Sequence, residues 1–241
     1  MSLHRLFVPP ERIGEVVRLS PQQSRHLETV LRLAAGDEVE IFDGQGARWE
    51  ARIESPGLLR LGKRREGQGG ATDVWLAQGL AKGEKLDLVV QKATELGATR
   101  IIPLATERSV VRLDEQRGER RAQRFRRIAE EAARQSGRSD VPRIDAPRTI
   151  ADLTQLLGED RERRGVLLDP AEHDVRLAQV ARGSPKLLLV VGPEGGLTAA
   201  ERAGAIAFGF VPASLGRLVL RTETAGLVAL AVVQHVAGVL G

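Results

Sequence analysis

The strongest constraint on the fold is the alternation of short apolar runs with helical patterns from Asp73 to the C-terminus. Residues 166–168 and 187–191 are apolar without interruption, which is typical of strands buried on both faces. A short apolar run at 74–77 and a further predicted strand at 100–104 precede stretches whose apolar residues recur three or four positions apart. This alternation predicts an α/β fold with a parallel sheet covered by helices.

The N-terminal 70 residues follow another pattern. Residues 20–23, Ser-Pro-Gln-Gln, form a capping box at the start of a helix that we expect to end before Gly36. Alternating residues predict strands at 38–42 and 48–53, joined by a turn at 43–46. The glycine-rich, charged stretch 62–70 is typical of a domain boundary. We therefore expect a small β-rich domain over 1–70 and an α/β domain over 71–241.

Composition excludes several classes of protein. The 241 residues include no cysteine, which removes disulfides, thiolate metal sites and cysteine nucleophiles. The four histidines lack metal-ligand spacing, so we expect no metal. No apolar stretch is long enough to span a membrane, and the apolar run at the start is too short for a signal peptide. We expect a cytoplasmic protein that does not enter a membrane.

The charge is concentrated in one window. Between Thr106 and Arg148 there are 12 arginines and 8 acidic residues. Two interpretations stand: a basic surface for a polyanion such as RNA, or a solvated helix face with Glu–Arg pairs. Aromatic residues make up 3% of the chain and tyrosine is absent, so RNA would be bound mainly by guanidinium groups and backbone rather than by stacking.

The most informative loop is VVGPEGGLTAAE, residues 190–201, which directly follows the most apolar predicted strand. Parallel sheets bind ligands at the carboxyl ends of their strands, and Gly192, Gly195 and Gly196 would let a ligand approach the main chain. Thr198 and Glu201 form a second capping box, so a helix is expected to start directly after the loop. The alternative is an ordinary tight strand-to-helix turn.

A similar arrangement follows at 214–225, SLGRLVLRTETA, before a last helix at 225–240 whose only polar side chains are Gln234 and His235. A helix that is apolar nearly all round must be covered on more than one side, and a subunit interface is one way to cover it. Dinucleotide, phosphate-loop and serine-elbow motifs are absent from the sequence.

GPEGG before a Thr-x-x-Glu helix start, followed by LGRLVLRTETA, closely resembles the RsmE family of the SPOUT RNA methyltransferases. RLFVPP, HLETVLRL, GDEVEIFDGQG, QKATELGATRIIPLATERS and EEAARQSGRSDVP also match the pattern of that family, so the likeness covers nearly the whole chain. The resemblance implies an N-terminal PUA-like β-barrel and a C-terminal SPOUT domain with a parallel sheet and a deep trefoil knot, working as a homodimer. It also implies methyl transfer from S-adenosylmethionine to N3 of a specific uridine, U1498, in 16S rRNA of the small ribosomal subunit.

Carried over by position, the resemblance implies donor-binding residues in three loops: Leu168, Pro170, Val191, Gly192, Pro193, Gly195, Gly196, Leu215, Gly216, Leu220, Thr224 and Ala225. We expect Arg221 to stabilise negative charge on the uracil, and Glu194 to accept the N3 proton or to orient a loop. Expected RNA contacts are Arg5, Arg25, Arg32, Arg108, Arg112 and Arg138.

Two alternatives belong to other functional classes. The chain could be a non-catalytic RNA-binding or ribosome-assembly factor that uses its PUA-like domain, or a methyltransferase that acts on a ribose 2′-hydroxyl. Binding of the methyl donor would distinguish the first alternative, since a ligand of the folded state raises its stability. Mass spectrometry of digested RNA would distinguish the second.

Overall fold

The computed structural model describes residues 3–67, 72–80, 85–109 and 115–241, and its side chains are described from Gly118 onward in the last range. The chain forms two compact units. Unit 1 contains Met1–Gly69 and Glu130–Val141, and unit 2 contains Gly70–Ala129 and Pro142–Gly241. No helix in the described ranges is long and apolar enough to cross a membrane.

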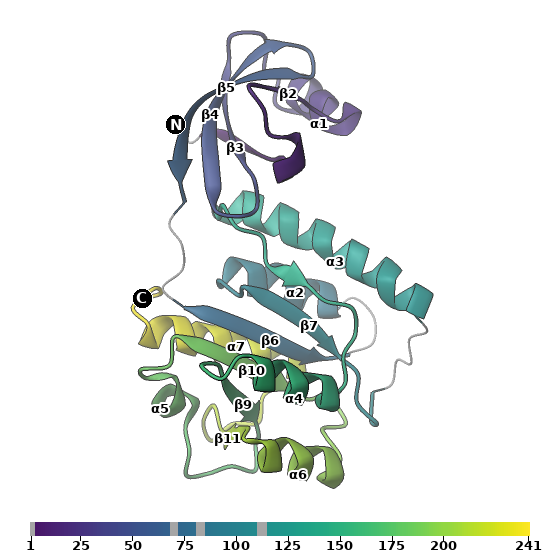
Figure 1. Cartoon of the computed structure of the whole chain (residues 1–241), viewed down its shortest axis with the longest axis vertical. Coiled ribbons are helices and arrows are strands. Elements are labelled where there is room, and N and C mark those ends of the chain that lie inside the picture. Colours follow the sequence, from purple (N-terminus) through teal and green to yellow (C-terminus); the bar gives the residue numbers. More distant parts are fainter. Residues whose placement is uncertain (1–2, 68–71, 81–84, 110–114) are drawn as a thin grey trace. The chain divides into compact units, whose positions relative to one another are not determined.

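Unit 1 is built on a curled sheet with the strand order β1-β3-β4-β5-β2 (Figure 1). The strands are β1 His4–Phe7, β2 Val16–Arg18, β3 Glu38–Phe42, β4 Ala47–Ser55 and β5 Leu58–Glu66. A short 3-10 helix, η1 Pro10–Arg12, the helix α1 Pro21–Arg25 and a π-helical turn, η2 His26–Val30, complete the N-terminal part. The predicted strands at 38–42 and 48–53 are confirmed as β3 and β4.

The core of unit 1 is formed by the inward residues of this sheet together with η2. Its fully buried members include Val17, Val39, Ile41 and Leu59, and Leu27 joins them from η2. The expected capping box is confirmed, because the Ser20 hydroxyl accepts a hydrogen bond from the backbone of Gln23. The expected helix divides into α1 and η2, since its second half winds with the wider π spacing.

The stretch 62–70, expected to mark a boundary, is partly strand. β5 continues to Glu66 because Arg64, Arg65 and Glu66 pair with residues of β4. Beyond the sheet, unit 1 includes residues 130–141, the end of α3 (Glu115–Ser136) and the loop after it. The backbone N–H of Val141 donates to Gly44 O, and the N–H of Gly46 donates to Ser139 O.

Unit 2 is built on a six-stranded sheet with the order β11-β9-β10-β6-β7-β8, and every pairing in it is parallel. Its strands are β6 Asp73–Gly79, β7 Arg100–Leu104, β8 Arg143–Ile144, β9 Arg164–Leu168, β10 Lys186–Val191 and β11 Val211–Ala213. All residues of β10 after Lys186 are buried, as the uninterrupted apolar run predicts for a central strand. The parallel α/β prediction is confirmed.

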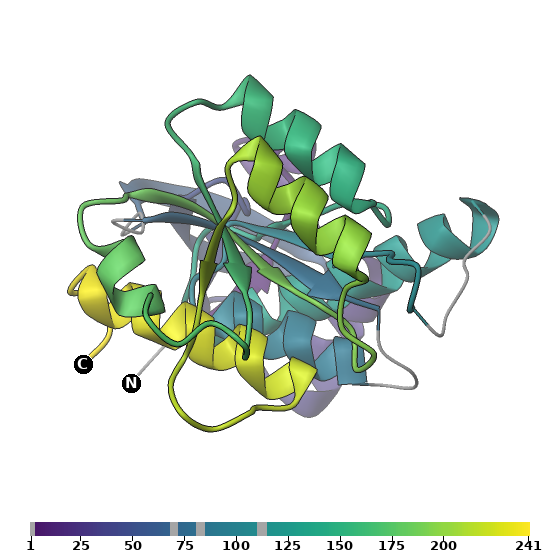
Figure 2. The same ribbon diagram turned by 90° about the horizontal axis from the view of Figure 1, so that it is seen from below.

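Helices cover both faces of this sheet. Figure 2 shows α4 and α6 on one face and α2 and α7 on the other, and α5 packs against α7. Their bounds are α2 Lys85–Glu95, α4 Ile150–Glu159, α5 Leu177–Ala181, α6 Ala199–Phe208 and α7 Thr222–Val236. The predicted capping box of α6 is confirmed by the hydrogen bonds between Thr198 and Glu201.

Successive side chains of a strand point to opposite faces, so β10 contributes to two cores. Leu188 and Val190 pack with α4 and α6 in a cluster that also contains Leu153 and Phe210. The last helix, expected over 225–240, runs from Thr222 to Val236. Its Gln234 is buried, where its amide donates to the carbonyls of Leu96 and Gly97.

Candidate functional site

A pocket of about 670 Å³ lies at the carboxyl edge of the parallel sheet of unit 2. Three loops form most of its wall: 168–170 after β9, 192–197 after β10 and 214–221 after β11. These strands are parallel, so their carboxyl ends meet at one edge although the loops are far apart in the chain. This size is typical of a site for a small organic ligand.

The structure brings together most of the residues expected to bind the methyl donor. The pocket is lined by Leu168, Pro170, Val191, Gly192, Pro193, Gly196, Leu215, Gly216, Leu220 and Ala225. Gly195 belongs to the loop after β10 and Thr224 to the first turn of α7, and neither is among the residues that line the pocket. The Gly195 carbonyl instead accepts a hydrogen bond from Arg108 at 3.0 Å.

Two glycines of the wall have backbone conformations that side chains disfavour. Gly196 has a φ of +69° and Gly216 a φ of +148°. A Cβ atom at either position would meet no other atom within 4 Å. There is space for a side chain at both positions, so close packing does not explain the two glycines. Because neither residue has a side chain, its main chain is open to the pocket.

A third glycine, Gly79, allows the loop after β10 to pack directly against strand β6. A Cβ atom on Gly79, the last residue of β6, would lie 2.6 Å from the carbonyl carbon of Gly192 and 2.7 Å from Cα of Pro193. The loop after β10 thus rests directly on the backbone of β6. This close approach is possible only because residue 79 has no side chain.

The first residue of α7 ties the second loop to the last helix. The Thr222 hydroxyl donates to Gly192 O at 2.5 Å, and the Gln78 amide donates to the Thr222 hydroxyl at 2.9 Å. Gln78 and Thr222 are both buried. A Cβ atom on Gly226 would collide with Gln78 Oε1, which explains a glycine inside an otherwise apolar helix.

Three charged side chains cluster in the pocket wall. Lys85 Nζ lies 3.0 Å from Glu194 Oε1 and 3.5 Å from Glu223 Oε1. The hydrogen bond to Glu194, together with the charge of Glu223, raises the pKa of Lys85 above its ordinary value. Lys85 therefore stays protonated and links the loop after β10 to the start of α7. Glu194, expected either to accept the N3 proton or to orient a loop, lines the pocket and pairs there with Lys85.

Arg221 also lines the pocket, at the position that precedes α7. Its side chain is exposed, and within the ranges that the structure describes no hydrogen bond or ion pair engages it. A cation without an internal partner can turn toward a ligand at low cost. Another cation of the wall, Arg202, is held differently, since its Nε donates to Asp169 at 2.6 Å.

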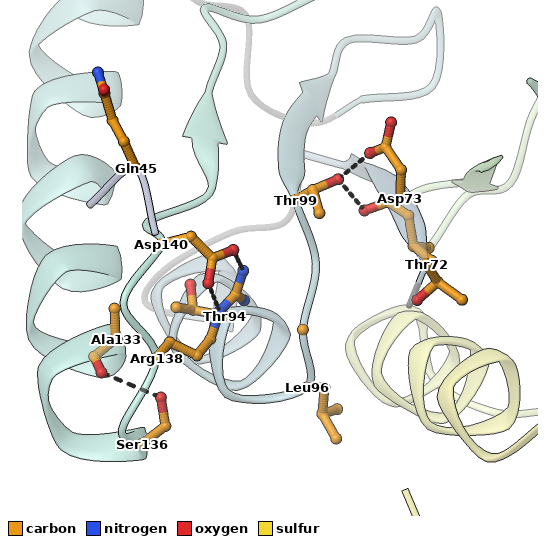
Figure 3. A network of polar contacts seen from close by, with 12 residues as sticks. Gln45, Thr72, Asp73, Thr94, Leu96, Thr99, Ala133, Ser136, Arg138 and Asp140 are labelled. Carbon is orange, nitrogen blue, oxygen red and sulfur yellow. Dashed lines mark hydrogen bonds and ion pairs between the residues drawn. The ribbon is translucent and has the colours of Figure 1, made fainter. Parts of the chain in front are cut away.

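Two of the expected RNA-contact residues take part in internal contacts of unit 1. The Arg5 guanidinium lies 2.6 Å from Glu40 and donates to the Arg138 carbonyl at 3.0 Å. Figure 3 shows that Arg138 itself pairs with Asp140, and the distance between their charged atoms is 2.5 Å. Both arginine side chains are largely buried, at 12% and 13% exposure. The Arg5 guanidinium ties residues 133–139 to strand β1, because it also donates to Ala133 O and Ser139 Oγ at 3.4 Å. Contact of either arginine with RNA stays a prediction.

The other expected RNA-contact residues differ from one another. Arg25 and Arg32 are exposed on unit 1. Arg108, besides its bond to Gly195, donates to Leu197 O at 3.4 Å and so braces the loop after β10. Arg112 lies outside the described residues.

The arginine-rich window contains many ion pairs. Arg126 pairs with Glu119, and Arg134 with Glu131, both within α3. Asp145 pairs with Arg143 and Arg148 of the window and with Arg100 of β7. Many arginines between Thr106 and Arg148 therefore pair with acidic residues, as the interpretation of a solvated face with Glu–Arg pairs predicts. Fewer of them are available to bind RNA.

Sequence reasoning did not single out Lys85, Gln78 and Glu223. Gln78 belongs to β6, and Lys85 begins the helix after it. The sequence pattern had already predicted that strand as part of the parallel sheet. Since parallel sheets bind ligands at the carboxyl ends of their strands, Gln78 and Lys85 could have been proposed as site residues from their position alone.

Comparisons with known proteins agree with this architecture. Residues 69–234 match the family described as RNA methyltransferase domain, and residues 19–61 match the RNA methyltransferase PUA domain. Ribosomal RNA small subunit methyltransferase E of Bacillus subtilis is 32% identical over 90% of this chain and 89% of its own length. The Synechocystis protein of the same name is 36% identical over 95% of this chain and 76% of its own length.

Solved structures show the same relationship. Ribosomal RNA small subunit methyltransferase E from Neisseria gonorrhoeae, bound to S-adenosyl methionine, has a TM-score of 0.86 at 29% identity and covers 97% of each chain. A Legionella pneumophila protein solved with the cofactor SAM has a TM-score of 0.87 at 32% identity and covers 98% of each chain. The resemblance carried by GPEGG and LRTETA is thereby confirmed. The chain belongs to the RsmE family, that of ribosomal RNA small subunit methyltransferase E.

Proposed function

We propose that this protein uses S-adenosylmethionine to methylate N3 of a specific uridine, U1498, in the 16S rRNA of the small ribosomal subunit. The observation that carries the proposal is the pocket formed by the three loops after β9, β10 and β11. Two structural neighbours, at 29% and 32% identity, were solved with this methyl donor bound. The substrate class follows from the names of the relatives.

The residues of the pocket fit the donor. Its wall combines exposed main chain at Gly196 and Gly216 with apolar side chains such as Leu168, Leu215 and Leu220. A flat nucleoside base requires both kinds of surface, since its edge forms hydrogen bonds and its faces pack against apolar groups. The carboxylates and Lys85 lie at the polar part of the wall.

The bound donor supplies a methyl group already activated on a sulfonium, so the protein has to align the acceptor and make its nucleophile available. N3 of uracil carries a proton that must leave. Arg221, exposed at the pocket and without an internal partner in the described ranges, stabilises the negative charge on the uracil. Glu194 accepts the proton or holds its loop in place through Lys85.

The remaining expectations belong to the same proposal. Unit 1, whose residues 19–61 match a PUA domain of RNA methyltransferases, contacts the RNA. Along the chain the proposed domain bounds are 1–70 and 71–241, with residues 130–141 of the second range belonging to unit 1 in the structure. The α/β domain contains the trefoil knot, and the protein acts as a cytoplasmic homodimer. The dimer is tested by light scattering: a stable, active species near the 26.1 kDa of one chain would contradict it.

The decisive experiment incubates the purified protein with S-adenosylmethionine and small ribosomal subunits that lack the modification, and maps the product by mass spectrometry of digested RNA. A methyl group on N3 of one uridine supports the proposal. A methyl on a ribose would assign the protein to 2′-O transfer, and binding of RNA without donor binding would make it a non-catalytic RNA-binding or assembly factor.

A further inference from the structure

Glu223, the second residue of α7, has a carboxylate oxygen that no described group engages. Across the described parts of the chain, three buried side-chain atoms that could form a hydrogen bond have no partner: Arg48 Nε, Gln78 Oε1 and Glu223 Oε2. Of these three residues, only Glu223 lines the pocket. A buried carboxylate oxygen that accepts no hydrogen bond is costly, so its presence in a ligand pocket calls for an explanation.

The other acids of the pocket wall are engaged more strongly. Asp169 accepts from Arg202 at 2.6 Å, and Glu194 accepts from Lys85 at 3.0 Å with a side chain that is 40% exposed. Glu223 Oε1 lies farther from the same ammonium, at 3.5 Å, and the Glu223 side chain is 16% exposed. Lys85 therefore holds mainly Glu194, and the Glu223 carboxylate keeps most of its capacity to accept a hydrogen bond from a ligand.

The start of α7 holds the Glu223 backbone in place and leaves its carboxylate adjustable. The preceding residue, Thr222, is bonded to Gly192 O at 2.5 Å and to Gln78 at 2.9 Å. The last torsion of a glutamate is broad and roughly two-fold, so a rotation of the carboxylate exchanges its two oxygens without moving the backbone. Arg221, two residues before Glu223, lines the same pocket. One short segment thus presents a cation and a hydrogen-bond acceptor together.

We propose that Glu223 is the catalytic base that accepts the N3 proton of the target uracil, while Glu194 orients its loop through Lys85. The inference rests on the proposed function. N3–H is the only ring N–H of a uridine base, and it lies between two carbonyl groups. A carboxylate matches this donor, and a guanidinium group matches a neighbouring carbonyl. Cytosine has an acceptor at N3, so the same carboxylate disfavours it.

The proposed step balances in atoms and charge. Glu223 takes the proton as the N3–H bond breaks, and the electron pair of that bond forms the new bond from N3 to the methyl carbon. The electron pair of the broken carbon–sulfur bond stays on sulfur, which becomes an uncharged thioether. Arg221 offsets the negative charge that develops on the uracil. Glu223 releases its proton to water after the products leave.

Glu223→Gln keeps the shape of the side chain and removes its capacity to take a proton. In single-turnover reactions at saturating donor, we expect methyl transfer at pH 7 to slow by about a hundredfold or more. The residual rate should rise about tenfold per pH unit between about pH 6 and 8, because solvent must then remove the proton, whereas the wild-type rate should stay nearly constant. Affinity for S-adenosylmethionine, measured by calorimetry without RNA, should stay within about twofold of wild type. Glu223→Asp keeps a carboxylate, so it should show a lower rate with the flat profile.

Glu194→Gln is the matched control, because it removes the other carboxylate that pairs with Lys85. It should weaken donor binding and keep the flat pH profile. An acid in the first turn also stabilises a helix, so the melting temperature of each variant is measured too. A lower melting temperature with a flat profile in Glu223→Gln would make Glu223 structural and overturn the inference. Weaker donor binding with a wild-type rate at saturating donor, or a steep profile in Glu194→Gln alone, would also overturn it.

The same measurements distinguish this inference from the proposed function. If the wild-type enzyme methylates N3 and Glu223→Gln keeps its rate and flat profile, the function stands and Glu223 leaves the mechanism. If the wild-type enzyme methylates a ribose hydroxyl and Glu223→Gln has the steep profile, the N3 assignment falls and Glu223 stays the proton acceptor of the site. A wild-type protein that transfers no methyl group overturns both.

Discussion

The close approach of β6 to the loop after β10 allows a quantitative test with one methyl group. In Gly79→Ala the new Cβ atom would lie 2.6 Å from the carbonyl carbon of Gly192 and 2.7 Å from Cα of Pro193. These neighbours are backbone atoms, which cannot rotate aside as a side chain can. Pro193 N lies closer still, so the loop must move away by more than the 0.8 Å that separates 2.6 Å from an ordinary contact of about 3.4 Å.

This retreat has two measurable consequences. Overpacking of a rigid contact costs about 1–3 kcal/mol, and each kcal/mol lowers the melting temperature of a chain of this size by about 2–4 °C. Gly192 and Pro193 line the pocket, so the displacement also moves its wall. A misplacement near 1 Å reduces the rate of an aligned reaction by as much as a hundredfold. We expect weaker binding of S-adenosylmethionine by calorimetry and slower methyl transfer.

Gly204→Ala is the matched control. Gly204 lies in α6, and a Cβ atom there would meet nothing within 4 Å. Alanine in a helix interior is more stable than glycine by about 0.5–1 kcal/mol, so this variant should melt slightly higher and bind the donor normally. If Gly79→Ala also melts at or above the wild-type temperature and binds the donor with unchanged affinity, the steric argument is refuted.

Three further predictions concern charge and ligand. Asp145 is 1% exposed and pairs with Arg100 at 2.5 Å; burial alone would raise the pKa of Asp145, but the hydrogen bond and charge of Arg100 hold it below the ordinary 3.8. Its stabilising contribution is therefore complete at neutral pH and is lost only as the pH falls below about 4 and through the lowered pKa of Asp145. Asp145→Asn should cost about 3–5 kcal/mol in denaturant unfolding at pH 7, and this cost should shrink progressively as the pH is lowered through that range. Arg221→Ala should slow methyl transfer about a hundredfold with donor affinity unchanged in calorimetry, and unchanged turnover would remove Arg221 from the mechanism. S-adenosylmethionine at about 100 times its dissociation constant should add about 2.7 kcal/mol of stability in thermal unfolding, and no shift would favour the non-catalytic alternative.

Local patterns predicted much of the fold. The capping boxes at Ser20 and Thr198 were correct because a cap depends on residues three positions apart. The prediction of strands at 166–168 and 187–191 was correct because a strand that is buried on both faces has an uninterrupted apolar sequence. A third box, between Thr149 and Asp152 at the start of α4, had the same signal and was overlooked.

Contacts between distant residues could not be predicted in this way. Arg5 and Arg138 were interpreted only as RNA contacts, since nothing near Arg5 in the chain indicates that its guanidinium pairs with Glu40 and donates to the Arg138 carbonyl. The place of residues 130–141 in unit 1 could not be predicted for the same reason, because that segment forms backbone hydrogen bonds with Gly44 and Gly46 in the distant turn between β3 and β4. Such pairs depend on the completed fold rather than on a repeating pattern.

The loop GPEGG illustrates how a segment with few side chains can still be well defined. A loop of this kind cannot hold itself by packing of its own side chains, so other elements must hold its backbone. Arg108 donates to the Gly195 carbonyl and Thr222 donates to the Gly192 carbonyl, while Gly79 supports the loop from β6. These contacts come from segments after β7, at the start of α7 and at the end of β6. The loop is therefore fixed by its neighbours, and its main chain at Gly196 stays uncovered on the side of the pocket.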